Sequence, residues 1–167
     1  RFEECRFVDC RLSGSAFRVA SFLQCQFEGC DLSGWDIEGL RFVEVQFKAS
    51  KLVGFHWTTL KTDPLTAVSF EDCVLDYSDF SRFTLKRGRM VRCSVREATF
   101  ERTDLSDCDC RESDFAGSSF DNTNLSKADF REARGYAIDA RTNRVKGLRV
   151  SLPDALNVLT AMDIRVG

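Results

Sequence analysis

Residues 98–132 read ATFER TDLSD CDCRE SDFAG SSFDN TNLSK ADFRE, which is seven successive units of five residues. In each unit the first residue is small, the third is apolar, and the other three are mostly polar or charged. An amphipathic helix repeats every 3.6 residues and a half-buried strand every 2, so a period of five fits neither. A fixed period over many units indicates a repeat architecture.

The same period runs through most of the 167 residues. The apolar position recurs from Phe2 to Trp57, breaks once, and resumes from Leu65 to Phe130. These 26 positions hold 13 Phe and 8 Leu, and the other five are also apolar. We therefore expect every fifth side chain to point inward, with a small inward side chain two residues before it. The predicted core ladder includes Phe7, Phe27, Phe47, Phe80, Phe100 and Phe120.

Units such as TNLSK at 123–127 and ADFRE at 128–132 resemble the pentapeptide repeat family, whose unit is small–[Asp/Asn]–[Leu/Phe]–x–x. The resemblance implies an all-β solenoid, a right-handed quadrilateral β-helix with four units in each 20-residue coil. It covers residues 1–135, with a break or loop at 58–64. Residues 136–167 are predicted to form a C-terminal cap that carries a dimerisation helix.

Seven of the eight cysteines occupy the small inward position, and Cys110 occupies the large one. Stacked coils would place cysteines 20 residues apart about 4.8 Å from one another, with parallel side chains that do not suit a disulfide. We expect buried reduced thiols, which are typical of a cytoplasmic protein. A metal site at Cys108 and Cys110 is disfavoured because both sulfurs should face the core. The stacked pairs are Cys5 with Cys25, Cys10 with Cys30, and Cys73 with Cys93.

The break at 58–64 contains Pro64 and no clean repeat. A loop that contacts a partner and a tolerated insertion explain it equally well. His56, the single histidine, precedes the break and is expected to be a packing or surface residue. The sequence contains no phosphate-binding loop and no nucleophile–histidine arrangement, and a filled rod offers no pocket. We therefore expect no enzyme activity, no cofactor and no metal.

Beyond Phe130 the repeat fades. Ser151 and Asp154 have the spacing of a capping box, ahead of a helix predicted at about 152–162 and a short terminal strand. The apolar side chains of this cap could cover only their own coil, but their distribution favours a two-fold dimer. The predicted dimer residues are Leu156, Leu159, Met162, Ile164 and Val166.

This ending, SLPDAL at 151–156 and DIRV at 163–166, is similar to that of the quinolone-resistance (Qnr) and albicidin-resistance pentapeptide repeat proteins. The stretch from residue 45 to 73 also resembles the albicidin-resistance branch. The resemblance implies a head-to-head homodimer that binds DNA gyrase or topoisomerase IV and protects it from inhibitors by imitating duplex DNA.

Charge limits that imitation. A dimer would form a rod of about 60 Å, and duplex DNA of that length carries about 35 negative charges. This chain has a formal charge of -2, so a dimer has only -4 and any mimicry must be local. Residues 103–132 sum to -5 and form an acidic belt. Its predicted target-binding residues are Asp104, Asp107, Asp109, Glu112 and Asp114.

Two of these five, Asp107 and Glu112, stand outside the position where the family commonly has Asp or Asn. Residues 82–102 sum to +5 and form a basic collar that a DNA mimic does not need. A structural or adaptor solenoid for another protein therefore remains the alternative function.

The near balance of 24 basic and 26 acidic residues argues against direct nucleic-acid binding. The lack of a long apolar run argues against a membrane span. The sequence leaves open the inhibitor, the host, the preference between gyrase and topoisomerase IV, the role of the collar, and whether further coils precede residue 1.

Overall fold

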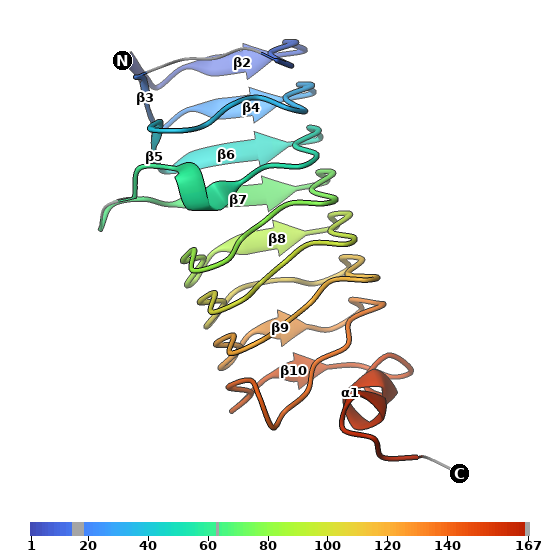
Figure 1. Cartoon of the computed structure of the whole chain (residues 1–167). Coiled ribbons are helices and arrows are strands. Elements are labelled where there is room, and N and C mark those ends of the chain that lie inside the picture. The colour runs from blue at the N-terminus through green and yellow to red at the C-terminus, as the bar shows by residue number, and fades with distance from the viewer. Residues whose placement is uncertain (15–18, 63, 166–167) are drawn as a thin grey trace.

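Successive turns of the chain stack along one axis as a β-solenoid of about seven turns, seen in Figure 1. The computed structural model describes residues 1–14, 19–62 and 64–165, so the predicted positions Phe17 and Val166 lie outside the described residues. One short helix, α1 (Leu156–Ala161), lies beside the last turn. The strands are β1 (Phe2–Glu3), β2 (Arg6–Val8), β3 (Ser21–Leu23), β4 (Gln26–Glu28), β5 (Arg41–Val43), β6 (Val45–Lys48), β7 (Val68–Glu71), β8 (Arg89–Val91), β9 (Asp129–Phe130) and β10 (Arg149–Val150).

The pairs between the named strands are all parallel, and their register follows the coil length. Phe2 pairs with Phe22, and Phe22 pairs with Phe42. The three sheets are β1-β3-β5, β2-β4-β6-β7-β8 and β10-β9. In every named strand pair except β6 with β7, a residue pairs with the one 20 positions later, so four five-residue units complete one turn, as the predicted winding requires.

The interior is filled by the predicted ladder. Phe27 and Phe47 are fully buried, and their rings stack at a centroid distance of 5.2 Å. In a second column Phe100 stacks on Phe80 and on Phe120, each at 5.0 Å. Such columns bury large apolar side chains in successive turns of the rod, which provides the main stabilisation of the fold.

The eight cysteines are all free thiols, as expected from their stacking; six are buried as predicted, whereas Cys5 and Cys10 are only half-buried. The sulfurs of Cys108 and Cys110 lie 3.6 Å apart inside the core. Burial raises the pKa of Cys25 and of Cys30, so these thiols stay neutral. Within the part of the chain that the structure describes, no three His, Cys, Asp or Glu side chains are grouped as metal ligands.

The break in the repeat differs from its prediction. Residues Trp57–Thr59 form a 3-10 helix, η1, and the N–H of Lys61 still bonds to the carbonyl of Leu40 at 2.9 Å. The chain leaves the coil only after Lys61, and the register then steps from Phe47 to Phe70, which is 70 − 47 = 23 residues.

The prediction that Leu65 belongs to the core was wrong, because its side chain is 63% exposed. By contrast, Leu60, which directly follows η1, is buried, with 5% of its surface exposed. The three extra residues push the segment that contains Leu65 outward, so the inward sequence resumes at Val68 and Phe70.

The C-terminal end also differs from its prediction. The coil continues beyond residue 135, because β10 pairs with β9 and the side chains of Tyr136 and Ile138 are buried. The helix is limited to residues 156–161 rather than about 152–162, and the described residues 163–165 form no strand.

Ser151 and Asp154 do not cap the helix as predicted. The hydroxyl of Ser151 accepts the N–H of Glu132 at 2.7 Å, and the carboxylate of Asp154 accepts the N–H of Gly135 at 2.9 Å. In earlier turns, the backbone N–H groups at these positions donate to carbonyl oxygens of the following coil. Here the chain turns into the helix, so side-chain oxygens satisfy these N–H groups instead.

Candidate protein-binding surfaces

The four sides of the solenoid carry the candidate residues. Face 1 follows β1, β3 and β5 and continues through Leu85, Leu105 and Leu125, whereas face 2 follows β2, β4 and β6 through β10. Face 3 comes next along the chain and includes the coil position of Phe115. The faces matter because residues of one coil that lie on different faces cannot form one flat surface.

The acidic belt wraps around one coil. Asp104 and Asp107 flank Leu105 on face 1, Asp109 and Glu112 flank Cys110 on face 2, and Asp114 adjoins Phe115 on face 3. The sequence therefore placed these residues in one turn, but the structure distributes them over three sides.

Three of the five belt carboxylates already have partners. Arg111 Nε donates to Asp109 at 2.8 Å, and Asn124 donates to Asp104 at 3.1 Å. Asp114 is buried, and its Oδ2 atom forms ion pairs with a guanidinium nitrogen of Arg96 at 2.6 Å and of Arg134 at 3.1 Å. The ion pairs offset the negative charges of Asp109 and Asp114, whereas Asp104 keeps its charge but has its carboxylate engaged by a neutral amide.

Asp107 and Glu112 differ from the other three. Both side chains are exposed, and among the described residues neither forms a side-chain hydrogen bond or an ion pair. Both occupy corners of the coil, where their φ angles of 57° and 60° lie in the left-handed region. These two carboxylates are the members of the belt that remain available to a partner.

We expect the substitution Asp114→Asn to destabilise the fold at neutral pH. Burial by itself raises the pKa of Asp114, but the hydrogen bonds from Arg96, the Ala116 N–H and Arg134 outweigh it, so the pKa is lowered. A carboxyl whose folded pKa is depressed contributes stability above its unfolded pKa of about 3.9, and this contribution disappears as the pH falls through the folded value. The loss should be about 1–3 kcal/mol at pH 7.

Chemical denaturation of the Asp114→Asn variant between pH 7 and pH 3 checks this. The difference from the wild type should shrink below about pH 4. The matched control is Asp107→Asn, which removes an exposed, unpaired carboxylate and should leave stability unchanged. An Asp114→Asn effect that is independent of pH contradicts the electrostatic explanation.

The basic collar is partly neutralised in the same way. Arg92 pairs with Asp72 at 2.7 Å, and Arg102 lies 3.6 Å from Glu101. Arg96 holds Asp114 as described above. Among the described residues, no side-chain hydrogen bond or ion pair involves the exposed cations Arg82, Lys86 and Arg87.

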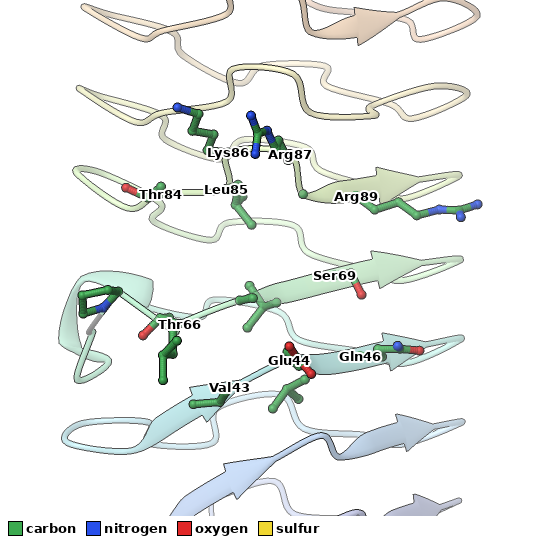
Figure 2. Close-up of a pocket in the computed structure, with 16 residues that line it drawn as sticks. Val43, Glu44, Gln46, Thr66, Ser69, Thr84, Leu85, Lys86, Arg87 and Arg89 are labelled. Carbon is green, nitrogen blue, oxygen red and sulfur yellow. The ribbon is translucent and has the colours of Figure 1, made fainter.

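A groove joins this collar to the inserted loop, a relationship that the sequence did not indicate. It has a volume of about 770 Å³ and lies between residues 64–69, which are the end of the loop and the start of β7, and Thr84–Arg89 of the following coil. Residues 43–46 of the preceding coil also line it. Figure 2 shows Thr84 and Leu85 on one side of the groove and Thr66 with Val43 on the other. Lys86 and Arg87 stand at its rim.

The predicted dimer residues lie together at the C-terminal end. Leu156 is 39% and Ile164 is 45% exposed, while Leu159 and Met162 are half-buried. Val158, which was not predicted, packs α1 against the core. The end of the rod therefore exposes an apolar surface on and after the helix.

Two family profiles match the sequence. The profile described as "Pentapeptide repeat region" matches residues 1–80, and that described as "Pentapeptide repeats (8 copies)" matches residues 93–132. Together they include more than half of the chain. The chain belongs to the pentapeptide repeat family.

Solved structures of other pentapeptide repeat proteins are similar to this one. A trypsin-treated form of QnrB1, a plasmid-mediated fluoroquinolone resistance protein, matches over 99% of this chain and 91% of its own, with 18% identity and a TM-score of 0.49. HetL, a protein involved in heterocyst differentiation regulation from the cyanobacterium Nostoc sp. strain PCC 7120, matches over 90% of this chain and 87% of its own, with 13% identity and a TM-score of 0.38. No curated protein sequence matches this pentapeptide repeat protein.

No helix in the described part of this pentapeptide repeat protein is long and apolar enough to cross a lipid bilayer.

Proposed function

We propose that this pentapeptide repeat protein is a non-enzymatic cytoplasmic protein that binds DNA gyrase or topoisomerase IV and protects it from inhibitors. The resemblance of residues 151–156 and 163–166 to the ending of resistance proteins suggests the target. The observation that carries the proposal is the presence of two free carboxylates, Asp107 and Glu112, on successive corners of one coil. A surface that binds duplex DNA is basic, so exposed and unpaired anions on a rigid rod are the groups it would recognise.

The mimicry in this proposal is restricted to a small area. Asp109 and Asp114 are bound by arginines and therefore contribute little field outside the rod. Exposed carboxylates that keep their full charge provide steering and specificity at an interface. We therefore assign target binding to Asp107 and Glu112, and a structural role to the paired members of the belt.

The proposed assembly is a homodimer formed through the C-terminal end. A self-complementary apolar surface on and after α1 suits a two-fold interface, in which the same residues of both copies meet. The dimer would place two acidic belts at equal distances from its centre, which suits a two-fold symmetric target.

The test is a supercoiling assay with purified gyrase in the presence of a fluoroquinolone or albicidin, repeated with topoisomerase IV. The wild-type protein should restore activity. The double variant Asp107→Lys with Glu112→Lys should need at least a tenfold higher concentration, because reversing two interface charges costs more than about 1.4 kcal/mol.

A matched control reverses two exposed glutamates elsewhere, Glu38→Lys with Glu97→Lys, and produces the same change in net charge. It should protect the enzyme like the wild type. Equal protection by the belt variant contradicts the assignment of Asp107 and Glu112. If the wild type neither protects nor inhibits gyrase or topoisomerase IV, the alternative of an adaptor solenoid for another protein replaces the proposal.

A further inference from the structure

The hydrogen-bond ladder of face 1 is interrupted at the turn that contains the three extra residues. In the coil that follows it, the backbone N–H and C=O of Thr84 and the C=O of Lys86 form no hydrogen bond among the described residues. The N–H groups of Leu85 and Arg87 do donate hydrogen bonds, to the carbonyls of Asp104 and Ser106 in the next coil. Thr84–Lys86 is therefore paired on one side only.

The same positions in later coils show what is missing. The N–H of Asp104 bonds to Phe83 at 3.0 Å, and its C=O accepts the N–H of Leu85 at 2.8 Å. Asn124 repeats both bonds with Thr103 and Leu105, at 2.9 and 2.8 Å. Thr84 lacks these two bonds because the loop occupies a different path from a regular strand.

The open edge faces unfilled space. Besides the groove of about 770 Å³, two smaller hollows of about 260 and 410 Å³ line the same seam between residues 57–69 and 81–89. Thr84 and Lys86 are exposed, and Figure 2 shows Thr84 and Leu85 beside the groove. Solvent reaches the free backbone groups, so an incoming chain can reach them as well.

The rim of the groove favours an acidic occupant. Lys86, Arg87 and Arg89 contribute three positive charges, whereas Glu44 is the one carboxylate among the described residues that line it. Glu44 also accepts a hydrogen bond from Gln24 at 3.1 Å, and Arg89 lies 3.9 Å from Glu71. The exposed side chain of Leu65 adds an apolar contact on the loop side.

We propose that this groove binds an extended acidic segment of a partner protein, which adds as a strand to the free edge at Thr84–Lys86. An unpaired strand edge is a template for another strand, and main-chain hydrogen bonds supply affinity in such complexes. The cations at the rim select acidic side chains on the incoming strand. The proposal is independent of the topoisomerase as target and gives the basic collar a function that DNA mimicry does not provide.

The probe is a fluorescein-labelled ten-residue peptide in which aspartate and valine alternate, titrated with the full chain and followed by fluorescence anisotropy. A second peptide has the same sequence with alternate backbone nitrogens methylated, so it keeps the charges but cannot pair as a strand. We expect the methylated peptide to bind at least tenfold more weakly. Hydrogen exchange at the Thr84 amide should slow when the unmethylated peptide binds.

The variant Lys86→Glu with Arg87→Glu should weaken binding at least tenfold. The matched control is Lys146→Glu with Arg144→Glu, two exposed cations of a later coil that lie outside the groove and give the same change in net charge; it should bind like the wild type. Circular dichroism checks that these surface substitutions leave the fold intact.

Three results would overturn the proposal. The first is no binding of the peptide at up to about 1 mM, and the second is equal binding of the methylated peptide. The third is that a 20-base-pair DNA duplex, rather than the peptide, binds with sensitivity to the Lys86 and Arg87 changes, which assigns the basic rim to nucleic acid.

Discussion

Replacing Phe100 by alanine is expected to lower the free energy of unfolding by about 3–5 kcal/mol. Phe100 is fully buried, and its ring lies between those of Phe80 and Phe120 at 5.0 Å on each side. The substitution removes both stacking contacts and leaves a cavity in the middle of the rod. Neighbouring coils cannot close it, because their hydrogen-bond ladder fixes the coil spacing. Urea denaturation followed by far-ultraviolet circular dichroism measures the loss.

Phe7→Ala is the matched control for this prediction. Phe7 occupies the same kind of repeat position but is half-buried, and it stacks at 4.6 Å on Phe27 in the next coil of its column. Its replacement should cost about 1–2 kcal/mol, because less apolar surface returns to water. Equal losses for the two variants contradict the explanation that stacking on both sides stabilises the central coils.

The double variant Leu156→Asp with Ile164→Asp is expected to convert the proposed dimer into a monomer. These side chains are 39% and 45% exposed at the C-terminal end, so their replacement leaves the core of the protomer intact. Burial of one such side chain contributes about 1.5–3 kcal/mol, and loss of two should weaken association at least hundredfold. Size-exclusion chromatography with light scattering measures the change.

Val19→Asp is the control for the dimer, because Val19 is 91% exposed and lies far along the chain from α1. This variant should remain a dimer. A wild-type protein that is monomeric across the accessible concentrations, or a Leu156 and Ile164 variant that stays dimeric, contradicts the assignment of the interface to the C-terminal end.

Most of the core could be read directly from the sequence, because the five-residue period specifies which side chains point inward. Phe27 above Phe47 and the free stacked cysteines follow from the period and the 20-residue coil. Among the residues that the structure describes, Leu65 was wrongly assigned to the core, and it follows the place where the period fails. The sequence pattern could not show how many residues lie outside the coil there, because that number depends on where the backbone hydrogen-bond ladder stops.

The candidate binding surfaces were predictable only in part. Sequence alone identified Asp107 and Glu112 as additional acidic choices, but it grouped them with Asp109 and Asp114. It could not show that Arg111 and Arg96 neutralise those two, because an ion pair depends on how side chains are directed across a coil or between coils. The roles of Ser151 and Asp154 were missed for the same reason: their acceptor oxygens serve a turn about 20 residues earlier.

The sequence by itself determined which side chains fill the interior, because the inward position repeats every five residues, and its resemblance to the pentapeptide repeat family implied the four-sided winding. Only the tertiary structure decided which charges remain free, where the ladder is left open at Thr84, and how the last coil is closed. Those features depend on the directions of individual side chains and on contacts between successive coils, which a local period does not specify.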